Sequence, residues 1–244
     1  IGKAIATDCV LGGQDVILCD IEPFAKISLS NLDNGFRLHG DQLSRYGFRR
    51  EGTAHFSKVT TSLKEAMDAA EILIVAVPAV GHTSFFTQMI PYLRDGQIIH
   101  IFPDNYGSLL FRKVMREMNS DKRIIVGGWS SAPFGSRLDM EGPYVLPSTR
   151  IMYRAVTLRG AALPMADQEE FLESIKYIRA MDGINTGDGP TSADTVMDTG
   201  FSNVNPILHC PGVILGAGTI ENYGVMYGDN KKDFSIYCHV YSPT

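Results

Sequence analysis

The sequence is poor in the features that mark several large classes of protein. Its 244 residues include only four cysteines, Cys9, Cys19, Cys210 and Cys238, and no two of them form a Cys-x-x-Cys pair. This scarcity argues against a disulfide framework and predicts reduced thiols, with Cys9 and Cys19 as small core residues. We also expect no metal site.

Long apolar runs and clusters of basic residues are missing as well. No stretch approaches the roughly 18 consecutive apolar residues of a membrane span, and no basic-then-apolar signal opens the chain. Lys and Arg together number 22 against 27 Asp and Glu, which gives a formal net charge of -5. Nucleic acids and membranes are therefore not expected as partners, and the predicted location is the cytoplasm.

The chain opens on a helix followed by a strand. Apolar spacing predicts a helix over 1–11, closed by Gly12-Gly13, and the apolar run over 15–20 predicts a buried parallel strand that ends in a carboxylate. This order is typical of the second half of the first βαβ unit of a dinucleotide-binding fold. In that unit Asp20 would bond the adenosine ribose hydroxyls, and Gly2 would be the last glycine of the phosphate loop.

Asp20 also bears on which dinucleotide is used. A carboxylate would repel a 2′-phosphate, so we expect NAD, with NADP as the alternative. The strand and the glycines that would come before Gly2 are not in this sequence. We therefore expect a piece of a longer protein, with a strand before Ile1 and a further helical part after Thr244.

Strands and helices then alternate regularly. Strands are predicted over 56–60, 72–77, 97–102 and 123–127, with helices over 63–70, 81–93 and 108–118, whereas 22–51 is expected to be helix and loop. The alternation predicts an α/β fold with a Rossmann-type doubly wound parallel sheet. Because ligands bind outside the carboxyl ends of such strands, Pro78 and the residues up to His82 are expected to face the cofactor.

The pattern changes after residue 129. Short apolar pieces over 144–146, 151–153 and 155–158 predict antiparallel strands at the sheet edge, and 167–179 is helical in pattern. The segment 183–190 is rich in Gly, Asp and Asn, which is typical of a domain boundary. We predict a dinucleotide-binding domain over 1–185 and the start of a mainly α-helical domain over 186–244.

The helical part contains a polar pair among apolar residues. Asn205 and His209 are spaced i,i+4, which places both side chains on one face of a helix over about 201–215. Pro206 would have to lie in the first turn or kink the helix. Such a histidine is either a core residue bonded to a carbonyl or a titrating group in a site.

These residues also carry a family resemblance. Asn203, Asn205, His209 and Pro211, followed by Leu215-Gly-Ala-Gly218, resemble a motif of the octopine/nopaline (opine) dehydrogenase family, as do the later 233–237 and 242–243. The resemblance covers nearly the whole chain. It implies an enzyme that joins an amino acid to an α-keto acid such as pyruvate, with loss of water, and reduces the imine with NADH or NADPH. It also implies that His209 is catalytic and that Asn203 and Asn205 bind substrate.

Two alternatives remain open. Hydroxyacid, glycerol-3-phosphate and ketopantoate dehydrogenases also combine a dinucleotide domain with helices, although no basic cluster for a phosphate is evident near His209. The second alternative is a non-catalytic NAD-binding protein whose helical part is a dimer surface. A homodimer is one assembly that the sequence allows.

Overall fold

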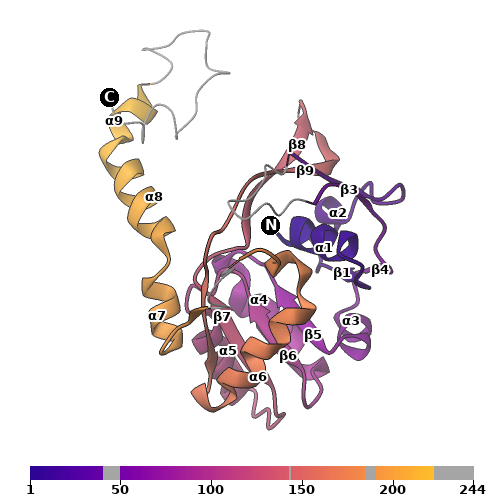
Figure 1. Ribbon diagram of the computed structural model, residues 1–244, viewed down its shortest axis with the longest axis vertical. Helices are drawn as coiled ribbons and strands as arrows, with labels where there is room; N and C mark the ends of the chain where they lie inside the picture. Colours follow the sequence, from indigo (N-terminus) through magenta and orange to yellow (C-terminus); the bar gives the residue numbers. More distant parts are fainter. Residues whose placement is uncertain (41–49, 143, 185–190, 223–244) are drawn as a thin grey trace. The chain divides into compact units, whose positions relative to one another are not determined.

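The computed structural model describes residues 1–40, 50–142, 144–184 and 191–222 (Figure 1). The chain divides into two compact units, Ile1–Ser202 and Asn203–Thr244. The predicted domain boundary at 185/186, the later motif pieces at 233–237 and 242–243, and Cys238 lie outside the described residues.

The first unit is built on a five-stranded sheet with strand order β11-β10-β7-β6-β5. Its strands are β5 (Ile72–Val75), β6 (Ile98–Ile101), β7 (Ile125–Trp129), β10 (Arg159–Leu163) and β11 (Thr191–Ser192). β5, β6 and β7 are parallel, as their continuous β-branched sequences predict, and β10 is antiparallel to β7. The predicted parallel α/β sheet is therefore confirmed.

Helices cover both faces of this sheet. Alternate strand residues such as Leu73 and Val75 pack with one group of helices, whereas Ile72 and Ile74 pack with the other. The first group is α3 (Leu63–Ala69), α4 (His82–Met89) and α5 (Gly107–Glu117), and the second is α1 (Gly2–Leu11) and α6 (Gln168–Glu173). The period of two along each strand thus divides the core into two layers.

Short 3-10 turns complete several of these connections. They are η1 (Ala79–Gly81), η2 (Ile90–Tyr92), η3 (Met165–Asp167), η4 (Ser174–Tyr177) and η5 (Arg179–Met181). The helix predicted over 167–179 is consequently only α6, followed by η4 and η5.

Two strands stand apart from the main sheet. β1 (Ile17–Cys19) pairs in parallel with β4 (Lys58–Thr60), with Leu18 opposite Val59. Both strands agree with the sequence prediction, although each is shorter than predicted. β1 and β4 form a separate two-stranded sheet.

A four-stranded sheet, in the order β3-β2-β9-β8, corrects two predictions. Its strands are β2 (Phe36–His39), β3 (Gly52–Ala54), β8 (Phe134–Glu141) and β9 (Tyr144–Arg154). The prediction of helix and loop over 22–51 was wrong for β2, where only Phe36 and Leu38 are apolar and both are fully buried. The strand pieces predicted over 144–146 and 151–153 both lie in β9 and belong to this second sheet, not to the edge of the main sheet, and 155–158 forms no strand. The helix in this region, α2 (Ala25–Ser28), is a single turn.

A buried ion pair joins α1 to the second sheet. Asp8 Oδ1 lies 2.8 Å from Arg154 Nη2, and Asp8 Oδ2 lies 2.9 Å from Arg50 Nη1. Arg50 also reaches Asp182 Oδ2 at 2.8 Å. Because Asp8 is fully buried, removing one of its cations would leave a charge without its compensation and would destabilise this junction.

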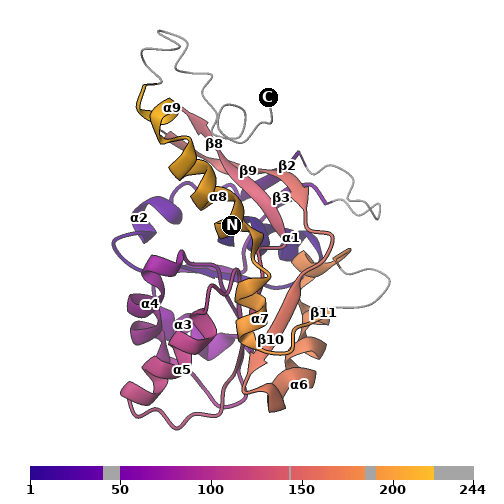
Figure 2. The same ribbon diagram turned by 90° about the vertical axis from the view of Figure 1, so that its left-hand side faces the viewer.

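The helix predicted over about 201–215 is interrupted at 202–203. α7 (Val196–Phe201) packs beside β10 and β7 in the first unit (Figure 2). The second unit contains α8 (Val204–Leu215) and α9 (Ala217–Glu221). Thr195 and Asn203 cap α7 and α8, which is why two helices form here instead of one.

Candidate functional site

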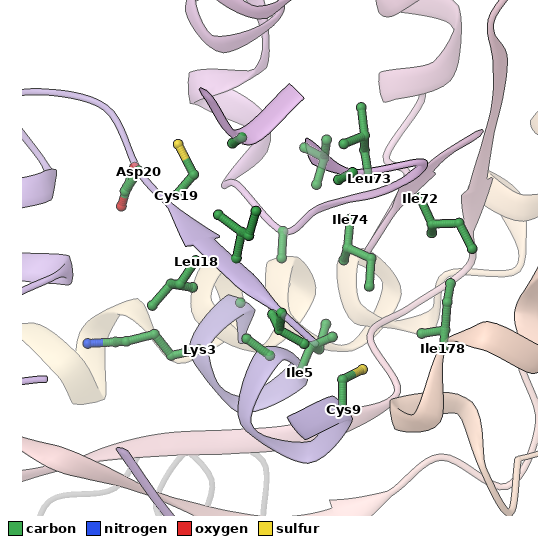
Figure 3. Close-up of a pocket in the computed structure, with 18 of the residues that line it drawn as sticks. Lys3, Ile5, Cys9, Leu18, Cys19, Asp20, Ile72, Leu73, Ile74 and Ile178 are labelled. Carbon is green, nitrogen blue, oxygen red and sulfur yellow. The ribbon is translucent and has the colours of Figure 1, made fainter. Parts of the chain in front are cut away.

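A cavity of about 1750 Å³ lies in the first unit between β1 and β5. Its lining includes residues 17–20 of and after β1, residues 72–77 of and after β5, and Gly2 and Lys3 of α1. Figure 3 shows Lys3 and Asp20 at one end of this cavity, with aliphatic side chains such as Ile74 and Ile178 along it. Two predicted cofactor residues, Gly2 and Asp20, therefore line the same space.

Gly2 is the first residue of α1 and lies beside the carboxyl end of β5. A Cβ built on Gly2 would lie 3.5 Å from the Cβ of Ala76, which is an ordinary contact distance. Packing in this structure therefore does not by itself require a glycine at this position. The N-cap residue, Ile1, makes no side-chain capping bond, so no side chain caps the first-turn N–H groups of α1.

Asp20 follows β1 directly, as predicted. Its Oδ1 accepts a hydrogen bond of 2.8 Å from the backbone N–H of Ile21, which orients the carboxylate at the strand end. Burial lowers the pKa of Lys3, and electrostatic attraction to Asp20 partly restores it. The end of the cavity thus holds one anionic and one cationic side chain close enough to interact.

Pro78 lies three residues after the end of β5 and is the N-cap of the turn η1. The Gly81 N–H donates to the Pro78 carbonyl at 2.8 Å. Pro78 is exposed and does not line the cavity, although the preceding residue, Val77, does.

His82 is buried at the start of α4 and does not line the cavity. Its Nε2 donates to the Val77 carbonyl at 3.0 Å, and a Cβ on Gly107 would lie 2.8 Å from its Nδ1. Burial lowers the pKa of His82 despite that hydrogen bond. These contacts give His82 a structural role, which is to hold the turn after β5 against the start of α5.

Sequence reasoning missed Asp104 at the carboxyl end of β6. Asp104 is fully buried, and its Oδ1 and Oδ2 accept hydrogen bonds of 2.8 and 2.9 Å from the N–H and Oγ of Ser108. Burial raises the pKa of Asp104 to about 6, although these hydrogen bonds oppose the rise. A carboxylate directly after a predicted strand was the available signal.

Asp104 also fixes its surroundings. A Cβ on Gly128 would lie 2.1 Å from the Asp104 Cγ, so the neighbouring strand must have a glycine there. Thr199 Oγ1 of α7 lies 3.5 Å from Asp104 Oδ2, while its own hydrogen goes to the Val196 carbonyl at 2.7 Å. The carboxyl of Asp104 is therefore packed between β7, α5 and α7.

The second unit places the predicted polar residues on α8. Asn203 is its N-cap, and the Asn203 Oδ1 accepts hydrogen bonds from the Asn205 N–H at 3.0 Å and Nδ2 at 2.9 Å. Asn205 and His209 both lie in the helix, one turn apart, and Pro206 is in the first turn. Within the helix the spacing therefore has the predicted consequence.

Apolar side chains surround this pair on α8. Ile207, Leu208 and Ile214 are more than half exposed in the described structure, while His209 is half-buried. Pro211 lies inside the helix, where it removes one backbone hydrogen bond. Asn203 was predicted to bind substrate. In the structure its side-chain oxygen accepts the hydrogen bonds from Asn205 and caps the start of α8.

The sequence predicts neither a metal site nor a membrane span. No group of three or more His, Cys, Asp or Glu side chains in the part of the chain that the structure describes is placed to hold a metal ion. None of the helices in the described ranges is long and apolar enough to cross a membrane.

Comparison with known proteins places this arrangement in context. No family model matches the chain. An opine dehydrogenase of Arthrobacter sp. (strain 1C) is 27% identical over 222 residues, which is 91% of this chain and 56% of that protein. The chain therefore spans little more than half the length of this curated relative.

Solved structures agree at the level of the fold. Octopine dehydrogenase with NADH and L-arginine matches with a TM-score of 0.64 and 15% identity, over 93% of this chain and 53% of that chain. Yersinopine dehydrogenase with NADP⁺ matches at 0.63 and 15%, over 87% and 50%. A ketopantoate reductase from Ralstonia eutropha JMP134 matches at 0.53 and 16%, over 86% and 56%.

The opine dehydrogenase structures thus have higher TM-scores than the ketopantoate reductase, and the Arthrobacter relative adds sequence similarity along most of the chain. The comparisons confirm the resemblance of this chain to the opine dehydrogenase family.

Proposed function

We propose that the protein is an NAD(P)-dependent opine dehydrogenase, which condenses the amine of an amino acid with an α-keto acid and reduces the product. The observation that carries the proposal is the cavity that Gly2 and Asp20 both line, in a chain similar to an opine dehydrogenase. In the reverse direction the same enzyme would oxidise the secondary amine.

The residues at the cavity end fit a dinucleotide. The first turn of α1 presents backbone N–H groups without a side-chain cap, and a helix N-terminus attracts phosphate. Asp20 would accept hydrogen bonds from the adenosine ribose hydroxyls, and Pro78 would border the cofactor at the end of β5. Lys3 lies close enough to Asp20 to reduce its repulsion of a 2′-phosphate, so NADP remains open beside NAD.

We propose chemical roles for three residues of the second unit. The amine and the keto acid would form a C=N bond with loss of water, and the hydride that reduces this bond is the chemistry that a dinucleotide would supply when bound. His209 would give a proton to the imine nitrogen, so that hydride and proton together yield the secondary amine. Asn205 and Asn203 would bind a substrate carboxylate or hold the imidazole in the tautomer that donates.

The solved neighbours support a proposal for the substrate class. Octopine dehydrogenase structures contain NADH with L-arginine, agmatine or pyruvate. We therefore propose pyruvate or a similar keto acid, together with an amino acid, as substrates of this protein.

The organisation of the whole protein is part of the proposal. Residues 1–185 would form the dinucleotide-binding domain, and 186–244 would begin the helical domain. We propose a cytoplasmic enzyme, either monomeric or a homodimer.

The direct test follows NADH and NADPH oxidation by the whole protein with pyruvate, with and without a panel of amino acids. We expect oxidation that requires both a keto acid and an amino acid. Oxidation with the keto acid alone would instead assign a hydroxyacid or ketopantoate type of dehydrogenase. Cofactor binding with no turnover for any pair would favour the non-catalytic NAD-binding protein.

A further inference from the structure

Tyr106 has an uncommon backbone conformation in the turn between β6 and α5. Four non-glycine residues in the described ranges have a positive φ, and three of them are asparagines, which tolerate this region. The fourth is Tyr106, with a φ of 62°, and it directly follows Asn105, with a φ of 44°. A bulky residue in this conformation is strained and persists only where the surrounding structure holds it.

Asp104 holds this turn in place. The Asp104 N–H donates to the Trp129 carbonyl at 2.8 Å, and the Asp104 carbonyl accepts a hydrogen bond of 2.6 Å from the Gly107 N–H. The backbone N–H of Tyr106 also bonds to the Asp104 carboxyl, where it opposes the rise in the pKa of that group. The turn is therefore fixed both to β7 and to the start of α5.

The ring of Tyr106 lies against the end of α7. A Cβ built on Gly200 would overlap this ring and lie 2.9 Å from its hydroxyl oxygen, so any side chain at Gly200 would displace the ring. The Phe201 ring meets the Tyr106 ring in a T-shaped arrangement, with 6.3 Å between the centroids. One aromatic side chain thus contacts the last two residues of α7.

This contact has a cost at two positions. Gly200 lies inside α7, where a glycine is less favourable than an alanine. The left-handed conformation of Tyr106 adds strain. Burial offsets these costs only in part, because Tyr106 remains 38% exposed and Phe201 remains 69% exposed. The contact therefore contributes more to the placement of α7 than to the hydrophobic core.

Tyr106 contacts the end of α7 that leads into α8. The first turn of α7 is anchored separately, because Val196 is buried in a small apolar cluster. After Phe201, only Ser202 comes before Asn203, which is the N-cap of α8. The placement of the last turn of α7 therefore determines the point from which α8 starts.

We propose that Tyr106 is a positioning residue. Its ring fixes the last turn of α7 and with it the start of the helix that carries Asn205 and His209. This inference rests on the proposed function, in which those two residues act on the substrate. Tyr106 does not line the cavity to which Gly2 and Asp20 belong, so cofactor binding should not depend on it.

The first test compares two variants of the whole protein. Tyr106→Asn removes the ring but keeps a residue that accepts a positive φ, whereas Tyr106→Phe keeps the ring. With pyruvate and the amino acid that the wild type uses best, we expect Tyr106→Asn to lower kcat by roughly tenfold or more and Tyr106→Phe to retain most of it. The NADH dissociation constant should be unchanged in both. Tyr92→Asn is the matched control, because Tyr92 is similarly exposed, at 42%, and lies on η2.

A second substitution separates positioning from stability. In the wild type, Gly200→Ala should lower both the Tm and kcat, because the added Cβ displaces the Tyr106 ring. In the Tyr106→Asn protein the same substitution should raise the Tm, because the space is then open and alanine favours the helix. The kcat of the double variant should nevertheless stay low, because the ring is still missing.

Amide exchange tests the contact without using activity. The Ser202 N–H donates to the Asp198 carbonyl at 2.9 Å, at the end of α7. This amide should exchange faster in Tyr106→Asn than in Tyr106→Phe. The Phe102 N–H, which donates to the Val75 carbonyl within the main sheet, should exchange equally in both variants.

Three outcomes would overturn the proposal. One is a kcat that recovers together with the Tm in the double variant, since Tyr106 would then only stabilise the fold. Another is a loss of kcat in Tyr106→Phe as large as that in Tyr106→Asn. The third is unchanged exchange at Ser202. A wild type that turns over no substrate pair would instead overturn the proposed function, and the exchange at Ser202 would then decide alone whether the ring holds α7.

Discussion

The indole N–H of Trp129 donates a hydrogen bond of 3.1 Å to Nδ1 of His100, in the centre of the main sheet. The other ring nitrogen, Nε2, lies 2.8 Å from Ser174 Oγ, which gives its own hydrogen to the Phe171 carbonyl at 2.7 Å. His100 is therefore neutral, with its proton on Nε2. Complete burial lowers the pKa of His100 to about 3.

This histidine should make the protein less stable in mild acid. In the unfolded chain His100 takes up a proton below about pH 6.5, whereas in the folded chain it does so only near pH 3. Between these values the unfolded state binds more protons, so stability is full above pH 6.5 and falls as the pH decreases. The His100 contribution should fall by about 1.4 kcal/mol per pH unit, measured by urea unfolding.

A His100→Gln variant isolates this contribution, because glutamine cannot take up the proton. The stability difference between the wild type and His100→Gln should shrink as the pH falls from 6.5 toward 4, while any other titrating group cancels. His55→Gln is the control, since His55 is exposed. A difference independent of pH would show that His100 does not titrate in this way.

Asp104 should have the opposite effect. Its folded pKa of about 6 lies above its ordinary value of 3.8, so the folded state binds more protons between these values. The Asp104 contribution is full below pH 3.8 and is lost as the pH rises through about 6. Asp104→Asn should remove this dependence and be at least as stable as the wild type at pH 8, because no charge is then buried.

Urea unfolding of the wild type and Asp104→Asn at pH 5 and pH 8 checks the expected sign. Ser108→Ala is a useful companion, because it removes one donor to Asp104 and should raise the carboxyl pKa further. Asp104→Asn could instead destabilise the protein equally at both pH values. That result would mean that the hydrogen bonds of the carboxyl group, and not its buried charge, determine its effect on stability.

The sequence predicts local structure well where one signal dominates. The runs over 72–77 and 97–102 are apolar and β-branched, and both form parallel strands of the main sheet, although β5 is the last strand in its order and not a central one. β2 was missed because apolar and polar residues alternate over only four positions in an otherwise polar segment. So short an alternation cannot be distinguished from chance. Whether a segment forms a strand depends mainly on its own residues, but the sheet that it joins depends on distant segments. The two predicted pieces of β9 were therefore assigned to the wrong sheet.

The same limit applies to the candidate site. The position of Asp20 could be predicted, because the end of an apolar run in the sequence indicates the end of a strand. Asp20 does follow β1 and lines the cavity. The partners of two buried groups could not be predicted, because they are far away in the sequence. Thr199 lies beside Asp104, and Ser174 lies beside His100. Asn203 shows a signal that was overlooked, since an Asn directly before an apolar helix is typical of an N-cap.

Asp20 should determine the preference between the two dinucleotides. Asp20→Ala removes an acceptor for the ribose hydroxyls and leaves Lys3 to attract a 2′-phosphate, so NADH binding should weaken more than NADPH binding. Fluorescence titration of the whole protein measures both dissociation constants. Asp15→Ala is the matched control, because Asp15 lies at the opposite end of the same strand. Equal weakening of the two cofactors would remove Asp20 from ribose recognition.

His209 should matter for turnover and not for cofactor binding. His209→Ala in the whole protein should lower kcat by about a hundredfold or more, as removal of an acid–base group does, and should leave the NADH dissociation constant unchanged. Asn205→Ala should mainly raise KM if it binds a substrate carboxylate, but should mainly lower kcat if it holds the His209 tautomer.

His55→Ala is the control for His209→Ala, because His55 is exposed and lies in the first unit. A loss of less than about threefold in His209→Ala would remove His209 from the mechanism and return it to the core-histidine interpretation. A large loss of kcat accompanied by a lower Tm could come from lost stability or from lost proton transfer. The His209→Gln variant distinguishes these two causes. Glutamine keeps the size and hydrogen bonding of the side chain but cannot supply a proton, so restored stability with kcat still low would assign proton transfer to His209.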